Sequence, residues 1–402
     1  MPCESIFSLH DEALLRQRRG ERIIDATVGV LLDDAGRLAV LPTVATALAE
    51  LSPLSWAPYA PAAGEADFLN AVKEKAYPPE LRASALAVAT PGATGAVSLA
   101  IGMSLEPGET LLTRSLHFTA YADLAAAQGR RLTTFPAFDS AGRFDVAALA
   151  RRLDAIAARQ SRLLIVLNDP CQNPTGYTMS PADWDALAEV VGALARKKST
   201  TILLDAAYAD FAPTVWKPPF AVLARLAESA DVLTAWSASK SLTAYGLRVG
   251  ALLALCPGAA RRRKLAATMA RGCGGRWGNV NRGGMMVIGR VLADPALAGR
   301  VLRERRVLIT LLNERAHAFR TAAERRGLMF DCREGGFFAC ATLQRGAARV
   351  AQAMRDRGGF VVPQAQALRF ALCALPAAQI PALVDMAADC LSERDDLARR
   401  AS

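Results

Sequence analysis

The strongest constraint on the fold is a regular alternation of two kinds of segment between Ala85 and Leu255. Short apolar runs typical of buried strands are separated by Ala- and Leu-rich stretches with helical character. We expect strands at Glu109–Thr113, Arg131–Phe135, Leu163–Leu167, Thr200–Leu204, Val232–Trp236 and Val249–Leu255, with helices at Ala120–Gln128, Val146–Arg159 and Pro181–Arg196. The alternation predicts an α/β fold whose mostly parallel, doubly wound sheet carries helices on both faces.

The pattern changes after Met285, where long amphipathic stretches replace the alternation. No linker rich in Pro, Gly or Ser separates the two parts, and 402 residues with 52% hydrophobic side chains suffice for two cores. The sequence therefore predicts a second, smaller α+β domain packed closely on the first. Its expected elements are helices at Met286–Ala293, Pro295–Arg326 and Pro381–Arg399, and short strands at Phe337–Leu343 and Leu368–Leu372.

The chain is basic, with a formal net charge of +10. Its densest basic runs, Arg261–Lys264 and Arg303–Arg306, have helical neighbours and no interleaved aromatic residues, which favours solvated helix faces over a nucleic-acid surface. Attraction of anionic substrates or cofactors is a milder use of this charge. No apolar run reaches the length of a membrane span and Met1–Gly20 carries charges throughout, so we expect neither a membrane segment nor a secretory signal.

The cysteines and histidines suggest no metal site. The three histidines are dispersed and no two cysteines form a CxxC pair, so we expect no zinc or other metal. A disulfide framework is unexpected in so long a chain, and reduced thiols in the cytoplasm are the plain interpretation. The eight cysteines are Cys3, Cys171, Cys256, Cys273, Cys332, Cys340, Cys373 and Cys390.

One of the seven lysines stands apart from the others. Lys240 follows the expected strand Val232–Trp236, and no other charge lies within several residues of it. The other six lie beside charged residues or in a Pro-rich loop: Lys73, Lys75, Lys197, Lys198, Lys217 and Lys264. A lysine that forms a Schiff base must lose its proton near neutral pH and therefore needs a setting of low polarity. Ligands of open α/β sheets bind beyond the carboxyl ends of strands, where Lys240 is expected.

Two further strands end in polar residues that suit a pyridoxal ring. Asp205 follows Ile202–Leu204, and a carboxylate at the end of a buried strand needs a cationic partner such as a protonated pyridine nitrogen. A helix N-cap is the alternative role for Asp205. Tyr208 and Asn173, the latter in an Asn-Pro-Thr-Gly segment that also suits a simple turn, could reach the ring oxygen.

A phosphate group requires backbone N–H groups at the start of a helix, hydroxyl groups and an arginine. The segment Pro91-Gly92-Ala93-Thr94-Gly95 precedes an apolar, helix-like run, and Ser237 and Arg248 could supply the rest. The segment lacks the spacing of a dinucleotide-binding fingerprint. Each signal is ambiguous alone, but together they cover the polar atoms of pyridoxal 5′-phosphate (PLP).

In this order, the segments resemble the class I/II aminotransferases of PLP fold type I, the aspartate and aromatic amino acid aminotransferase family. The resemblance extends from about Asp25 to the C-terminus. It implies an N-terminal arm with part of the small domain at 1–44, a large PLP-binding domain at 45–290 and a small domain at 291–402. The motifs that carry it are Pro91–Gly95, Asn173–Gly176, Asp205–Tyr208 and Ser237–Lys240, with Tyr245, Arg248, Val249 and Gly250.

The resemblance also implies a role for each matching residue. Lys240 would form the internal aldimine and shuttle protons, with Asp205 on the pyridine nitrogen and Tyr208 and Asn173 on the ring oxygen. The phosphate would be held by Gly92, Ala93, Thr94, Ser237 and Arg248, and Phe118, which could equally be a core residue, would stack on the ring. Arg369 would grip the substrate α-carboxylate, near Gly29 of the substrate-facing segment and Asn173. Tyr59 would reach the phosphate of a neighbouring subunit, which implies a homodimer with shared active sites.

The resemblance implies a ping-pong aminotransferase that moves an amino group from an α-amino acid to a 2-oxo acid. Within the fold, the alternative is a β-eliminating lyase or another PLP reaction on an amino acid, and a non-catalytic, PLP-binding regulator is an alternative of another class. The second arginine that recognises a side-chain carboxylate in aspartate-type members has no clear counterpart, with Arg276 as a weak candidate. The identity of the donor and acceptor is therefore open.

Overall fold

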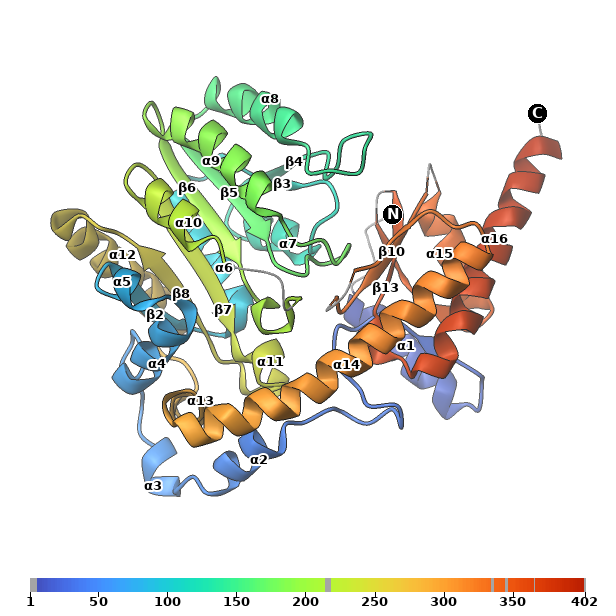
Figure 1. The fold of residues 1–402 in the computed structure, drawn as a ribbon, viewed down its shortest axis with the longest axis horizontal. Helices are drawn as coiled ribbons and strands as arrows, with labels where there is room; N and C mark the ends of the chain where they lie inside the picture. Colours follow the sequence, from blue (N-terminus) through green and yellow to red (C-terminus); the bar gives the residue numbers. More distant parts are fainter. Residues whose placement is uncertain (1–5, 214–217, 334–335, 344–345, 365, 401–402) are drawn as a thin grey trace.

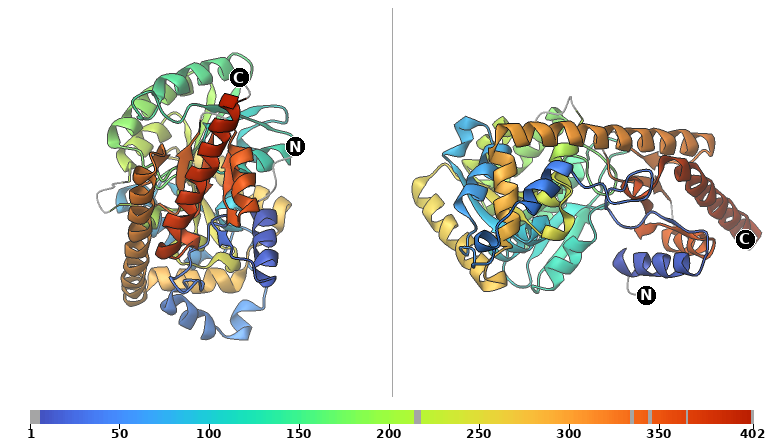
Figure 2. Two further views of the ribbon diagram at one scale, coloured as in Figure 1. Left: turned by 90° about the vertical axis from the view of Figure 1, so that its right-hand side faces the viewer. Right: turned by 90° about the horizontal axis from the view of Figure 1, so that it is seen from below.

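The computed structural model has two lobes, a larger one built on a central sheet and a smaller one beside it, joined by the long helix α14 (Pro295–Arg325) (Figure 1). Both termini lie at the end of the molecule formed by the smaller lobe (Figure 2). The structure describes residues 6–213, 218–333, 336–343, 346–364 and 366–400. Cys3 and Lys217 lie outside these ranges.

The central sheet has seven strands in the order β2-β8-β7-β6-β5-β3-β4. Only β8 runs antiparallel to its neighbours β2 and β7, so the prediction of a mostly parallel sheet is confirmed. The sequence did not predict β2 as a strand. The strands are β2 (Ala85–Thr90), β3 (Thr110–Arg114), β4 (Arg131–Phe135), β5 (Arg162–Asn168), β6 (Ser199–Asp205), β7 (Asp231–Ser237) and β8 (Gly250–Leu255).

Successive strand residues feed two apolar cores, one on each face of the sheet. On β5, Leu163, Ile165 and Leu167 belong to one core, whereas Leu164 and Val166 belong to the other. This is the two-residue period of a strand buried on both faces. One face is covered by α6 (Gly92–Ser104), α7 (Ala120–Ala126) and α12 (Ala259–Trp277), and the other by α4 (Ala66–Ala76), α8 (Val146–Ala157), α9 (Pro181–Ala195) and α10 (Phe220–Ala227). The predicted doubly wound arrangement is confirmed.

The smaller lobe combines an antiparallel sheet of order β12-β13-β10-β9 with a parallel pair, β1 and β11. β10 begins at Ala339, two residues later than predicted, because Phe337 and Phe338 pack into the interior between the lobes. The elements are α1 (Ile6–Arg18), β1 (Ile24–Asp25), β9 (Phe330–Asp331), β10 (Ala339–Thr342), α15 (Ala347–Asp356), β11 (Gly359–Phe360), β12 (Val362–Gln364), β13 (Ala367–Phe370) and α16 (Ile380–Arg400).

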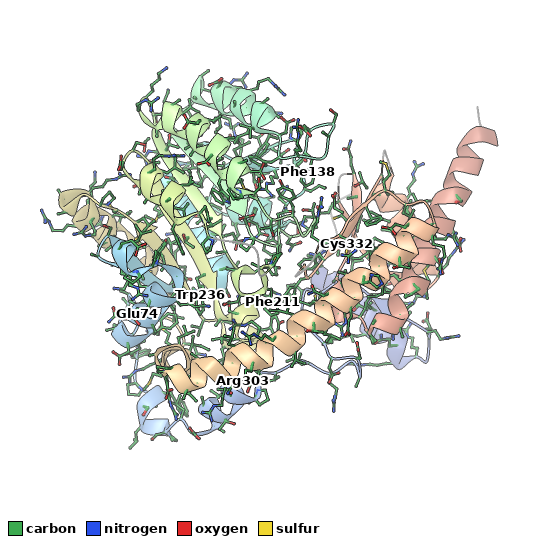
Figure 3. The ribbon with its side chains drawn as sticks, in the orientation of Figure 1. Glu74, Phe138, Phe211, Trp236, Arg303 and Cys332 are labelled. Carbon is green, nitrogen blue, oxygen red and sulfur yellow. The ribbon has the colours of Figure 1, made fainter. Side chains whose placement is uncertain are left out.

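Several shorter elements connect the lobes and fill their surfaces. The helix α13 precedes α14 and packs on α4, and α2 packs on both α13 and α14. Side chains fill the space between the sheet and α14, where Figure 3 labels Phe211, a member of the same apolar cluster as Leu312 of α14. The helices not yet given are α2 (Pro42–Ala49), α3 (Pro53–Trp56), α5 (Pro79–Arg82), α11 (Ala238–Ser241) and α13 (Arg282–Ala293).

Candidate active site

Lys240 lies on α11, a single turn that follows the carboxyl end of β7. The turn begins where the Ser237 hydroxyl accepts a hydrogen bond from the Ser239 N–H at 3.1 Å. The Lys240 Nζ donates to the carbonyl oxygen of Gly29 and lies over the Tyr245 ring, 4.7 Å from its centroid. Burial lowers the pKa of Lys240 to about 8, and the positive charges of Arg369 and Arg248 act in the same direction. The amine can therefore lose its proton near neutral pH.

Asp205 ends β6 and is only 5% exposed. Tyr121 Oη donates a hydrogen bond of 2.5 Å to its Oδ2, and the Ala207 N–H donates one of 3.2 Å to Oδ1. Burial raises the pKa of the carboxyl group, and the two hydrogen bonds oppose that effect. Within the described ranges no cation pairs with Asp205, so the carboxylate fits a ligand that brings a positive charge of its own.

Asn173 and Tyr208 lie around the same pocket. The backbone N–H of Asn173 donates to Asn168 Oδ1 at 2.7 Å, and Asn168 Nδ2 in turn donates to the Asp205 carbonyl at 2.7 Å. These bonds fix the loop after β5 against the end of β6. Tyr208 is buried with its ring 5.2 Å from that of Phe337, and burial and the nearby Asp205 raise the pKa of its hydroxyl well above the usual value.

Arg369 approaches the site from β13 of the smaller lobe. It is 2% exposed, stacks on the Phe338 ring at 4.6 Å and donates to the Thr27 carbonyl. Its Nη1 lies 3.5 Å from Asn173 Oδ1, and its Nε lacks a partner within the described residues. A buried guanidinium with a free donor fits an anionic ligand.

Gly29 leaves the space between Lys240 and Phe338 open. A Cβ at this position would lie 2.7 Å from Phe338 Cζ and 3.5 Å from Lys240 Nζ. Any larger residue would therefore have to displace the Phe338 ring or close the gap beside the amine.

A cradle for an anion lies where β2 meets α6. Gly92 opens α6 with a φ of +68°, and Arg248, with a φ of +53°, donates from Nη2 to the Pro91 carbonyl at 3.3 Å and from Nη1 to the Ser239 hydroxyl at 3.1 Å. A Cβ on Gly92 would lie 2.7 Å from Arg248 Nη2. Backbone N–H groups of the first turn, including those of Ala93 and Thr94, thus lie beside a guanidinium. This arrangement fits a phosphate group.

Of three further predicted residues, Phe118 borders this cluster through Tyr121, whereas Tyr59 is exposed and Arg276 is engaged by Gln128. Tyr59 is 91% exposed, whereas Asp205 and Arg369 are buried. Arg276 lies at the end of α12, where its Nη2 donates to Gln128 Oε1 at 2.8 Å. Gln128 follows the C-terminal end of α7, whereas Tyr121 lies near the N-terminal end of that helix. Phe118 is half-buried and packs edge-on against the Tyr121 ring at 5.6 Å.

Tyr121 is the contact that sequence reasoning missed. It lies in the Ala-rich helix α7, and its phenol reaches Asp205 across 84 positions of sequence. Phe118 precedes the helix, and no spacing pattern in the sequence singles out Tyr121.

Three kinds of feature are absent from the described residues. They hold no cluster of three or more His, Cys, Asp or Glu side chains suited to a metal ion, and the seven cysteines among them form no disulfide. No helix in the described ranges is both long and apolar enough to cross a membrane.

The chain matches the family model described as aminotransferase class I and II over residues 21–386. It is 29% identical over 307 residues to an aromatic-amino-acid aminotransferase of Pseudomonas aeruginosa, covering 74% of each chain. It is 26% identical to an aspartate aminotransferase of the same organism over 304 residues, again covering 74% of each.

Solved structures give the same result for the fold. An aminotransferase from Anaerococcus prevotii superposes with a TM-score of 0.87 at 28% identity, covering 95% of both chains. An aromatic-amino-acid aminotransferase from Burkholderia pseudomallei, covalently bound to pyridoxal phosphate, superposes with a TM-score of 0.79 at 21% identity, covering 97% of this chain and 98% of the other.

Proposed function

The chain belongs to the class I and II aminotransferase family and is a PLP-dependent aminotransferase, and we propose that its reaction is centred on Lys240. One observation carries the assignment: Lys240 has a pKa lowered to about 8, and the same sheet edge holds Asp205, a buried carboxylate without a cation. A neutral amine and an anion in one pocket are what a cofactor with an aldehyde and a basic ring nitrogen requires.

The residues of the candidate active site have two roles, cofactor binding and proton transfer. Bound PLP would supply an electron-withdrawing ring that makes the substrate α-proton acidic. Asp205, oriented by Tyr121, holds the proton on the ring nitrogen, while Asn173 and Tyr208 serve the ring oxygen. In that setting the Lys240 amine would accept the proton of the substrate α-carbon and later donate it back. Phe118 covers the ring, and Ser237, Arg248 and the amides of Gly92, Ala93 and Thr94 hold the phosphate.

Arg369 binds the α-carboxylate of the amino acid. Its buried guanidinium can make two parallel hydrogen bonds to a carboxylate, which fixes the α-carbon beside Lys240. Gly29 keeps the approach open. A carboxylate here would replace the neutral Thr27 carbonyl as partner of Arg369.

We favour amino donors with apolar or aromatic side chains over dicarboxylates. The Lys240 amine lies over the rings of Tyr208, Tyr245 and Phe337. Arg276 is engaged by Gln128 in the same chain. Some relatives are named for aromatic amino acids and others for aspartate, so the family leaves both choices open.

A homodimer is part of the proposal, because Tyr59, expected at the phosphate of a neighbouring subunit, is 91% exposed. It continues an exposed apolar segment with Leu54 and Trp56, which a second subunit would cover. We also propose the domain division at 44/45 and 290/291 and a cytoplasmic location.

The test is a set of single half-reactions. Purified enzyme is mixed with one amino acid at a time while absorbance reports conversion of the bound cofactor to its amino form. Phenylalanine or tyrosine should convert it faster than aspartate, and a 2-oxo acid should reverse the change. Release of ammonia and pyruvate without an acceptor would favour a β-eliminating lyase instead, and no conversion by any amino acid would favour a non-catalytic regulator. Lys240→Ala should abolish conversion.

A further inference from the structure

A basic cleft lies at the edge of the central sheet opposite the active site. Its volume is about 390 Å³, and it is formed by the amino ends of β3 and β4 and the outer face of α8. The strands β3 to β7 run parallel, and their carboxyl ends hold Asp205 and Ser237. The cleft is therefore separate from the site around Lys240.

Three arginines line the cleft: Arg131, Arg152 and Arg159. Arg131 donates only to a neutral partner, the Gly108 carbonyl, at 2.7 Å. In the part of the chain that the structure describes, Arg152 and Arg159 make neither an ion pair nor a side-chain hydrogen bond. Three guanidinium groups thus face one cavity without an anionic partner.

The single acidic side chain in the lining does not neutralise them. Glu109 uses its Oε2 to accept the Glu106 N–H at 2.7 Å, and Glu106 is itself paired with Arg162 at 2.6 Å. With three arginines against one glutamate, the lining keeps a net positive charge. Like charges gathered in this way repel one another unless an anion joins them.

The spacing of the arginines suits a compact polyanion. Arg152 lies on α8 and Arg159 in the turn after the end of that helix at Ala157, and both line the cleft together with Ala155 and Ile156. Because both arginines line one cleft, their long side chains can converge on a ligand between them. Arg131 faces them from β4, and Leu132 and Ile156 add apolar surface.

We propose that this cleft binds a small organic polyanion, a phosphate ester or a polycarboxylate, at a second site remote from the reacting atoms. One guanidinium group can donate two parallel hydrogen bonds to two oxygens of a phosphate or carboxylate group, which a point charge such as an ammonium group does not do. The inference does not rest on the proposed function, because none of its residues belongs to the site around Lys240.

The experiment uses the PLP-loaded enzyme, so that the phosphate cradle at Gly92 is filled. Inorganic pyrophosphate, and separately citrate, is titrated calorimetrically at constant ionic strength. Arg152→Ala/Arg159→Ala should weaken binding at least tenfold. The control is Arg263→Ala/Lys264→Ala, which removes two exposed charges from α12 and should bind as the wild type does. The stronger of the two probes identifies phosphate or carboxylate as the preferred group.

Three results would overturn the proposal: no saturable binding to the wild type, equal binding by all three proteins, or equal weakening in both double variants. The last would mean that net charge alone attracts the anion. Should the alanine variant melt at a lower temperature, Arg152→Gln/Arg159→Gln keeps the side-chain length and should lose binding in the same way.

Discussion

The two edges of the central sheet use charged residues in opposite ways. At the carboxyl edge, Asp205 and Ser237 are buried, and the buried Arg369 reaches Asn173 from the smaller lobe. At the amino edge, Arg152 on α8 and Arg159 in the turn after it are exposed. Burial changes acid–base behaviour at the first edge, as the pKa of Lys240 shows, whereas water screens the charges of the second. The same scaffold therefore supports chemistry at one edge and electrostatic attraction at the other.

Removing the buried charge of Asp205 tests this comparison most strongly. Asp205→Asn keeps the shape and an acceptor for Tyr121 but loses the anion, and should lower the transamination rate on the order of 10³-fold, in line with the roughly 3–5 kcal/mol that a missing partner costs a buried ion pair. Stopped-flow half-reactions measure this. The control Asp154→Asn changes an exposed acid on α8 and should have no effect. A small loss in Asp205→Asn would remove Asp205 from the reaction.

The pH dependence of cofactor capture sharpens the same contrast. Burial disfavours the charged amine, so the reactive neutral form of Lys240 grows as pH rises and reaches half near pH 8. The rate at which the apoenzyme captures PLP should fall about tenfold per pH unit below pH 8 and become constant above it. A rate that keeps rising to about pH 10, as for an ordinary exposed lysine, would contradict the burial argument.

Tyr121→Phe should give a smaller effect than loss of the carboxylate. The phenol hydrogen bond lowers the pKa of Asp205, so its loss lets the carboxylate protonate at higher pH. We expect roughly a tenfold lower rate, from the about 1.5 kcal/mol of a hydrogen bond to a charged group, and an acid limb of the pH–rate profile shifted upward. If the rate falls but the limb stays in place, Tyr121 is only a packing residue.

The smallest effect is expected at the amino edge. Arg152→Ala/Arg159→Ala removes two charges, yet kcat/KM measured without added polyanion should change less than about twofold, since surface substitutions remote from a site rarely matter. A large loss would mean that the two edges are not independent.

The residues that end the strands were accessible from sequence. Asp205, Ser237 and Lys240 follow uninterrupted apolar runs, and such runs identify buried strands whose ends share one edge. Arg369 came from the family resemblance, supported by the apolar residues Leu368 and Phe370 on either side, and it lies on the buried strand β13.

The contacts between distant segments were not accessible. Tyr121 meets Asp205 only because the fold brings the start of α7 to the carboxyl end of β6, and no local pattern encodes that pairing. The glycine-rich stretch at the end of α12 is a second case: glycine disfavours helices, yet the helix runs through to Trp277. Gly272 is needed there because a Cβ would lie 2.3 Å from Leu99 Cδ1 of α6. Packing between helices, rather than local propensity, decides this segment.

The most direct test of the account is to find which side chain carries the cofactor. The enzyme is loaded with PLP, reduced with borohydride, digested and analysed by mass spectrometry. A pyridoxyl group on the peptide that contains Lys240, at one per chain, is the expected result. A label on any other lysine, or colourless protein that takes up none, would contradict the central claim that burial beside a sheet edge makes this amine the reactive one.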